Sequence, residues 1–291
     1  MSATYPLKMV PFQVEMDVGE RMNFFESSNP AATDSVWQTI RAEAIAATRE
    51  EPVLGSYYHA AILNHPGFEA AISFHLANKL DSHTVPAMTV RSVILQALAA
   101  DPGIGAAMRA DIRAYEARDP ACDRFIMPFL YFKGFHALQA QRVSHWLWGQ
   151  KRRSLALYFQ NQISQEFGVD IHPGARIGSG IMIDHATGVV MGETVVVGDN
   201  VSMLHSVTLG GSGCVAGNRH PHIESGVLIS AGAKILGPVH IGEGAKIGAG
   251  SVVVESVPAH TTVVGVPARV VGRSGSDAPA LDMDHNFDLP G

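Results

Sequence analysis

The sequence predicts an α+β protein in which an all-helical half precedes a parallel β-solenoid. The solenoid follows from a period of six, because aliphatic residues stand at six-residue intervals from Ile171 to Val207 and again from Ile229 to Val253. This period matches neither the turn of about 3.6 residues of a helix nor the alternation of an exposed strand. It is typical of short strands stacked coil on coil. The helical half follows from apolar residues at helical spacing before about residue 167.

These patterns divide the chain into four segments. Residues 1–33 show no sustained period and are expected to be an N-terminal extension. Residues 34–167 are expected to form the helical domain and residues 168–272 the solenoid. Residues 273–291, rich in aspartate and proline, are expected to be a flexible tail.

Prolines separate the expected helices. The first helix is expected to begin at Asp34 or Ser35, either of which can cap it, and to end before Pro52. Further helices are expected over residues 68–80, after Pro86, after Pro102, over residues 130–148 and over residues 152–166.

Composition and length indicate a globular, enzyme-sized protein of the cytoplasm. Hydrophobic residues make up 46% of the chain and charged residues 16%, which suits a well-filled core. The net charge of −6 argues against a nucleic-acid or anionic-membrane partner. No apolar run reaches the roughly 18 residues of a membrane span. The two cysteines, Cys122 and Cys214, are too few for a disulfide framework and favour a reducing compartment.

A loop is expected to leave the solenoid between Val207 and Ile229, because their separation is not a multiple of six. The intervening residues are rich in glycine and polar side chains, and a long loop on a rigid scaffold is a common place for function. The loop carries Arg219 and His220. An arginine can bind a carboxylate through two parallel hydrogen bonds.

Asp184 and His185 are two polar residues inside an apolar strand pattern. A histidine oriented by a carboxylate is the usual general base near neutral pH. Asp170 precedes His185 by 15 residues, near the 18 that separate stacked positions on successive coils, so the spacing is compatible with a contact. With paired aspartates able to hold an ammonium group, the pattern suggests a site for a small amino acid.

A zinc site is an alternative interpretation. Three histidines on a β-solenoid can bind zinc, as in a solenoid hydratase, and His185, His205 and His220 are the candidate ligands. The favoured interpretation requires no metal. Gly178-Ser179-Gly180 is no dinucleotide loop, since no strand–helix unit surrounds it.

At these residues the chain resembles the bacterial serine O-acetyltransferases of the hexapeptide-repeat acyltransferase superfamily. In the solenoid the matching strings are Val169-Asp170-Ile171-His172-Pro173, Asp184-His185-Ala186-Thr187-Gly188, Val207-Thr208-Leu209-Gly210-Gly211, Arg219-His220-Pro221 and Gly265-Val266-Pro267-Ala268-Arg269. In the helical half they include Arg118-Asp119-Pro120-Ala121 and Lys133-Gly134-Phe135-His136-Ala137. The resemblance covers about residues 35 to 272.

The resemblance implies a left-handed β-helix with an extruded loop. It also implies that three chains associate along their solenoids, and that two trimers pair through the helical domains into a hexamer. The active sites would then lie between adjacent solenoids.

The resemblance further implies transfer of an acetyl group from acetyl-CoA to the hydroxyl of L-serine, as a step of cysteine biosynthesis. His185 would be the general base and Asp170 would orient it. The serine ammonium group would be held by Asp119 and Asp184, and its carboxylate by Arg219 and His220.

Acetyl-CoA would be a co-substrate, with no permanently bound cofactor. By resemblance, its pantetheine arm would contact backbone groups around Gly211, Ser212, Ala231 and Ala249. Free cysteine, which is serine with a thiol, would compete at the same site and act as a feedback inhibitor.

The chain departs from the family at three places. Cys214 stands where relatives often have lysine, and His205 where they often have glutamine. Relatives often end in an isoleucine that inserts into O-acetylserine sulfhydrylase, whereas this chain ends Asp288-Leu289-Pro290-Gly291, which argues against that partner. Two further alternatives are a solenoid acyltransferase for homoserine or an amino sugar, with the same base, and a catalytically weak scaffold for the sulfhydrylase.

Overall fold

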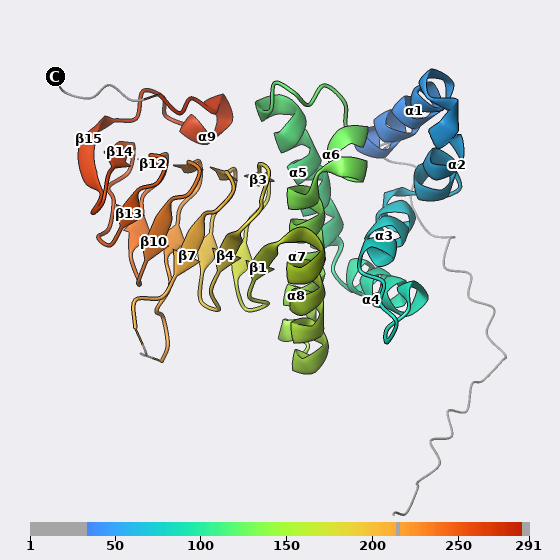
Figure 1. The fold of residues 1–291 in the computed structure, drawn as a ribbon, viewed down its shortest axis with the longest axis horizontal. Helices are drawn as coiled ribbons and strands as arrows, with labels where there is room; N and C mark the ends of the chain where they lie inside the picture. Colours follow the sequence, from blue (N-terminus) through green and yellow to red (C-terminus); the bar gives the residue numbers. More distant parts are fainter. Residues whose placement is uncertain (1–33, 214–215, 287–291) are drawn as a thin grey trace, which may run out of the picture. The chain divides into compact units, whose positions relative to one another are not determined.

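The computed structural model describes residues 34–213 and 216–286 (Figure 1). The expected N-terminal extension, Cys214 and the last five residues lie outside this part of the chain. By their contacts, the residues from Ser35 onward form one compact unit.

Helices occupy the chain up to Phe167, as the apolar spacing predicted. Their bounds are α1 Ser35–Glu50, η1 Pro52–Leu54, α2 Gly55–Tyr58, η2 His59–Leu63, α3 Phe68–Lys79, α4 Ala87–Ala100, α5 Pro102–Arg118, α6 Ile126–Tyr131, α7 Lys133–Gly149 and α8 Arg153–Phe167. Among the described residues, no helix combines the length and the apolar character that a membrane crossing requires. α8 ends at Gly168, whose left-handed backbone (φ 66°) turns the chain into the first strand.

The segment 130–148, expected to be one helix, is divided between α6 and α7. Phe132 has an extended backbone (φ −90°, ψ 107°) that ends one helix and precedes the next. This break allows the Phe132 ring to pack 5.6 Å from the ring of Tyr115 on α5. Hydrophobic spacing continues across the break, which is why the sequence pattern did not reveal it.

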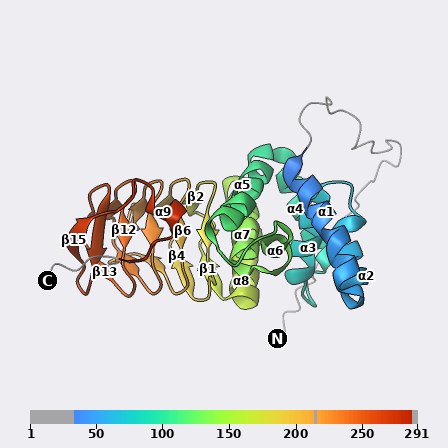
Figure 2. The same cartoon turned by 90° about the horizontal axis from the view of Figure 1, so that it is seen from above.

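The second half confirms the predicted β-solenoid, whose coils are built from three sheets (Figures 1 and 2). The first sheet is β1 Val169–Ile171, β4 Val189–Met191, β7 Thr208–Gly210, β10 Lys234–Leu236 and β13 Val252–Val253. The second is β2 Arg176–Ile177, β5 Val196–Val197, β8 His222–Ile223 and β11 His240–Ile241. The third is β3 Met182–Ile183, β6 Ser202–Met203, β9 Leu228–Ile229, β12 Lys246–Ile247, β14 Thr261–Val264 and β15 Arg269–Arg273. Neighbouring strands are parallel except that β15 is antiparallel to β14.

The first coil is two residues longer than the regular coil. Val169 pairs with Val189, twenty positions on, whereas Val190 pairs with Thr208, eighteen positions on. Since Ile183 still pairs with Met203, the two extra residues lie in the corner between β3 and β4. This corner contains the sequence Asp184-His185-Ala186-Thr187-Gly188.

The regular spacing of six hides this insertion. The residues that stack on Val189, Val195 and Val201 are Val169, Ala175 and Ile181, and not the predicted Ile171, Ile177 and Ile183. Both sets can face inward because alternate residues of a strand share one face, and Ile171 and Ile183 are also buried. A shift of two residues therefore leaves the apolar pattern intact.

The predicted loop leaves the solenoid between β7 and β8. Val196 pairs with His222, a separation of 26 residues, whereas Lys246 lies 18 residues after its partner Leu228. The eight additional residues account for the loop that follows Gly210.

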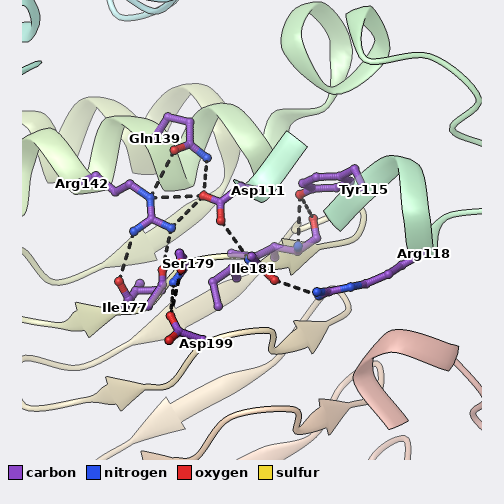
Figure 3. A network of polar contacts seen from close by, with 12 residues as sticks. Asp111, Tyr115, Arg118, Gln139, Arg142, Ile177, Ser179, Ile181 and Asp199 are labelled. Carbon is purple, nitrogen blue, oxygen red and sulfur yellow. Dashed lines mark hydrogen bonds and ion pairs between the residues drawn. The ribbon is translucent and has the colours of Figure 1, made fainter. Parts of the chain in front are cut away.

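Side chains of α5 and α7 bind the open edge of the first coil (Figure 3). The fully buried carboxylate of Asp111 accepts a hydrogen bond from the backbone nitrogen of Ile181 (2.9 Å) and an ion-pair contact from Arg142 (2.7 Å). Arg142 also donates to the carbonyl oxygens of Ile177 (3.1 Å) and Gly178 (2.7 Å). An unpaired strand edge would otherwise bury unsatisfied backbone groups.

Two further residues of α5 extend this edge contact. The Tyr115 hydroxyl donates to the carbonyl of Ile183 (2.9 Å) and accepts from its backbone nitrogen (3.1 Å). Arg118 donates to the carbonyl of Gly180 (2.9 Å). Polar side chains of the helices thus take the place of a preceding coil.

Residues 274–286, assigned by sequence to a flexible tail, instead lie along the third sheet. α9 Pro279–Asp282 contacts α5, β6 and β9 (Figure 2). The carbonyl of Ala280 accepts from Ser202 (2.7 Å), which in turn accepts from Arg118 (3.1 Å). His285 lies 2.8 Å from the hydroxyl of Ser230. Composition did not predict this packing, because it depends on only two buried residues, Pro279 and Ala280, together with these hydrogen bonds to the third sheet.

Replacing Asp111 by asparagine is expected to destabilise the fold strongly, because it leaves the guanidinium group of Arg142 buried without its counter-charge. Removal of one partner from a buried ion pair typically costs about 3–5 kcal/mol. The exposed pair of Glu50 and Arg124 provides a control, and Glu50→Gln should cost less than about 1 kcal/mol. Urea unfolding of both variants measures the difference, and equal losses would contradict the role given to Asp111.

Two buried histidines of the helical half are expected to make the fold acid-sensitive. Their ring centroids lie 4.8 Å apart, and burial lowers the pKa of His75 to about 2 and that of His136 to about 4. The unfolded chain binds protons below about pH 6.5 that the folded chain excludes. Stability is therefore complete above about pH 6.5 and falls toward pH 4, by up to about 1.4 kcal/mol per pH unit for each histidine.

The variant His75→Phe tests this origin. Its unfolding free energy between pH 6 and pH 4 should depend less steeply on pH than that of the unmodified protein. His83→Gln, at an exposed position, should leave the slope unchanged. Parallel slopes for all three proteins would show that the acid sensitivity has another source.

Candidate functional site

A cavity of about 420 Å³ lies beside the long corner between β3 and β4. It brings together three of the predicted site residues, Asp119, Asp184 and His185. The remaining lining residues are Tyr115, Ala121, Met127, Tyr131, Phe132, Lys133, Gly134 and Ile183. One wall of the cavity is therefore acidic, and the rest is largely aromatic and apolar.

The long corner turns His185 out of the solenoid. His185 and Ala186 both have left-handed backbones, with φ of 57° and 58°. The turn is tight: the backbone nitrogen of Ala186 donates to the carbonyl oxygen of Asp184 (2.6 Å), and the backbone nitrogen of Thr187 donates to the carbonyl oxygen of His185 (2.7 Å). The His185 side chain is 72% exposed, and its Nε2 lies 3.5 Å from Oδ2 of Asp184. An exposed imidazole beside a carboxylate can accept a proton from a bound hydroxyl group.

Asp119 reaches this cavity because it ends α5. Its carboxylate accepts a hydrogen bond from the nitrogen of Ala121 (2.9 Å), which fixes the turn that follows the helix. The bonds of Tyr115 and Arg118 to the first coil hold the same end of α5 against the corner. The bonds of Tyr115 and Arg118 drawn in Figure 3 therefore also hold the end of α5, and with it Asp119, at the cavity that Asp184 lines.

Asp170 lies on β1, where its backbone pairs with Val190. Its carboxylate accepts a hydrogen bond from the side chain of Gln160 on α8 (2.6 Å). Among the described residues no hydrogen bond joins Asp170 to His185. The spacing argument for their contact assumed a regular first coil, and the longer corner removes that premise.

A second polar group lies at the corner between the first and second sheets. Arg219 binds Glu193 (Nη2–Oε2 2.6 Å), and this hydrogen bond holds the pKa of the Glu193 carboxyl below its usual value. His220 is buried beside Thr194, and burial together with the charge of Arg219 lowers its pKa. Sequence reasoning found Arg219 and His220 but missed Glu193 and Thr194. Two polar residues at the end of a valine-rich repeat were the available signal.

One chain does not bring these two groups together. His185 lies at the corner that follows β3, whereas Arg219 and His220 lie at the corner that precedes β8. The zinc interpretation needs His220 beside His185 and His205. Only the last two are neighbours, with ring centroids 5.9 Å apart. Within the described residues no group of three or more histidine, cysteine or acidic side chains is arranged to hold a metal ion.

Two of the four predicted coenzyme contacts, Ala231 and Ala249, fall into one column with His205. The pairing of Met203, Ile229 and Ile247 places the residues two positions later in register, namely His205, Ala231 and Ala249. The His185 ring lies beside the first of them, 5.9 Å from the ring of His205. Backbone bonds follow the same column, from Gly232 to the carbonyl of His205 (3.0 Å) and from Gly250 to that of Ala231 (2.8 Å). Gly211 and Ser212 lie elsewhere, at the start of the extruded loop.

Comparison with known families gives matches in both halves of the chain. The family described as "Serine acetyltransferase, N-terminal" matches residues 36–140. The family "Bacterial transferase hexapeptide (six repeats)" matches residues 220–254. A serine acetyltransferase of Salmonella typhimurium is 58% identical over 252 residues, which cover 87% of this chain and 92% of the relative.

Solved structures agree with this similarity. Serine acetyltransferase from Vibrio cholerae superposes with a TM-score of 0.87 at 60% identity, covering 88% of this chain and 99% of that protein. A serine acetyltransferase in complex with cysteine gives a TM-score of 0.85 at 51% identity, and the match covers 87% of this chain and 98% of that protein. The serine acetyltransferase from Brucella abortus in complex with coenzyme A gives a TM-score of 0.82 at 52% identity, and the match covers 84% of this chain and 97% of that protein.

Gly134 at the start of α7 is expected to be indispensable for the shape of the cavity. A Cβ atom there would lie 2.1 Å from the carbonyl oxygen of Ile183, so Gly134→Ala must push α7 away from the corner that carries His185. The thermal unfolding midpoint of Gly134→Ala should fall by several degrees, since a loss of about 1 kcal/mol of stability lowers the midpoint by roughly 2–4 °C for a chain of this size. Gly149→Ala, at the other end of α7, meets nothing within 4 Å and should not lower the midpoint. Equal midpoints for the two variants would disprove the close approach.

Proposed function

This chain belongs to the serine acetyltransferase family and is an acyltransferase, and we propose that it transfers the acetyl group of acetyl-CoA to the hydroxyl of L-serine. The products are O-acetylserine and free CoA. The observation that carries the proposal is the cavity in which exposed His185 lies beside Asp119 and Asp184. The names of the relatives support the same acceptor and donor.

In the proposed reaction, His185 takes the proton from the serine hydroxyl as its oxygen attacks the thioester carbon. The tetrahedral intermediate then breaks its carbon–sulfur bond, and the protonated imidazole returns the proton to the leaving sulfur. General base catalysis of this kind contributes about 10²–10⁴ in rate. Holding the two substrates in line contributes much of the remainder.

Asp170 is proposed to stabilise the imidazolium form of His185 during the reaction. Its carboxylate is bound to Gln160, so this role requires the carboxylate to rotate or to share its free oxygen. Asp184, whose carboxylate is 3.5 Å from the ring, provides a second negative charge near the base.

Acetyl-CoA is proposed to lie along the column of His205, Ala231 and Ala249, which begins beside His185. Two alanines there leave room for a narrow pantetheine arm next to the solenoid backbone, and His205 lies between them and the base. The coenzyme A complex of the Brucella abortus relative supports a coenzyme site on this fold.

The serine ammonium group is proposed to bind Asp119 and Asp184, and its carboxylate to bind Arg219 and His220. Since these pairs lie at different corners of one chain, we propose that each site forms between two copies, as in a trimer. Pairing of two trimers into a hexamer through the helical half is part of the same proposal.

Cysteine is proposed to occupy the serine site and to inhibit the enzyme. The cysteine complex of a solved relative supports this ligand. The terminal residues that would meet the sulfhydrylase lie outside the described residues.

The decisive experiment measures thiol release from acetyl-CoA with serine, homoserine and glucosamine as acceptors. Release should occur with serine, be blocked by cysteine and be unaffected by a chelator. His185→Ala should lower kcat at least a hundredfold, because it removes the base, and should leave CoA binding nearly unchanged. His83→Gln, on the helical half, should retain full activity.

Three other results would overturn parts of the proposal. Preference for homoserine or glucosamine would replace the acceptor, and loss of activity with chelator would favour the zinc hydratase interpretation. Near-normal turnover of the His185→Ala variant would remove His185 from the role of base.

A further inference from the structure

Thr194 contacts both members of the Arg219–His220 pair. It lies at the corner between β4 and β5, and its Oγ1 accepts a hydrogen bond from the backbone nitrogen of Arg219 (3.2 Å). The same hydroxyl lies 2.9 Å from Nδ1 of His220. The backbone nitrogen of Thr194 donates to that Nδ1 as well (3.2 Å). No other residue in the described part of the chain forms hydrogen bonds with both.

These contacts determine where His220 carries its proton. A backbone N–H can only donate, so Nδ1 must present its lone pair, and a neutral imidazole then has its proton on Nε2. The Thr194 hydroxyl accepts from Arg219 and is therefore free to donate to the same Nδ1. Protonation of Nδ1 would break the contact with the backbone N–H, because that group cannot accept a hydrogen bond. Burial and the adjacent guanidinium group, which lower the pKa of His220, act in the same direction.

The Nε2 edge of His220 lies against two glycines. A Cβ atom at Gly192 would be 1.9 Å from Nε2, and one at Gly211 would be 3.5 Å from it. A side chain at Gly192 would displace the ring from this orientation, whereas a Cβ atom at Gly211 would be in ordinary van der Waals contact with it. The donor edge is thereby directed to the start of the extruded loop, where no side chain among the described residues accepts its proton.

Glu193 balances the charge of the pair. Its carboxylate binds Nη2 of Arg219 at 2.6 Å. With His220 neutral, Arg219 and Glu193 together carry no net charge before a ligand binds. Nη1 of Arg219 also donates to the carbonyl of Gly217 (3.3 Å). A carboxylate must then be recognised through the remaining guanidinium N–H groups and the Nε2–H group at a fixed geometry, and less through an excess of positive charge.

We propose that Thr194 is a positioning residue for acceptor binding, which holds His220 as the Nε2–H tautomer and ties it to Arg219 so that the two donors meet one carboxylate. The proposal rests on the proposed function, since it assigns the serine carboxylate to this pair. It assigns no contact between Thr194 and the substrate itself.

Thr194→Val tests the proposal, because valine keeps the shape of threonine and removes the hydroxyl. The serine KM should rise about three- to tenfold, as expected for the loss of one positioning hydrogen bond. The kcat and the KM for acetyl-CoA should change less than twofold. Thr194→Ser should restore the serine KM. Thr48→Val, which removes a helix hydroxyl bound to Ala44, is the matched control and should change neither constant.

The tautomer of His220 can be measured by NMR, independently of any activity assay. In the protein labelled with ¹⁵N-histidine, the His220 signals, assigned with His220→Gln, should show a protonated Nε2 and an unprotonated Nδ1 at pH 7. In Thr194→Val the Nδ1 signal should shift, because it loses one of its two donors. A protonated Nδ1 in the unmodified protein would overturn the proposal even if a variant failed to fold.

The outcomes separate this proposal from the proposed function. If the unmodified protein does not acetylate serine, the function fails, while the tautomer measurement still decides the role of Thr194. If the protein is active and Thr194→Val keeps the unmodified serine KM at an unchanged thermal midpoint, the function stands and the positioning role is disproved.

Discussion

The bonds between two helices and the first coil of the solenoid are the constraint on which the rest of the structure depends. A stack of parallel coils must end somewhere, and its last edge presents backbone groups without partners. Asp111, Tyr115, Arg118 and Arg142 satisfy these groups with side chains. Because the helices thereby dock in one register, the end of α5 and the start of α7 become walls of the candidate site.

The same contacts explain why a buried ion pair is retained in this protein. Asp111 and Arg142 bind each other, but each also binds backbone atoms of the first coil. An apolar replacement could fill the space without supplying these directional bonds. The pair therefore determines how the two halves fit together, and the position of Asp119 beside Asp184 follows from that fit.

The candidate base depends on an irregularity in an otherwise regular repeat. Two extra residues between Ile183 and Val190 allow the backbone to turn through two left-handed residues, which brings His185 out of the apolar column. Below it, regular coils continue as His205, Ala231 and Ala249. Repetition thus builds a straight surface for a long ligand, and the single departure from it places the reactive side chain at the end of that surface.

The sequence alone determined the α+β class, the solenoid, the extruded loop and the identity of the polar residues at its corners. Aliphatic residues at a spacing of six have no other simple structural reading, and Asp184, His185, Arg219 and His220 are out of place in an apolar repeat. The left-handed sense of the coil came from family resemblance, because the usual handedness preference predicts the opposite.

Only the tertiary structure decided the register of the first coil, the partner of Asp170 and the packing of residues 274–286. A shift by two residues preserves the inward and outward faces of a strand, so no apolar pattern can report it. Asp170 binds Gln160 on α8, and Thr194 binds His220 across 26 positions of chain. Such contacts depend on which residues the loop and the helices bring together, and that information appears only once the chain is folded.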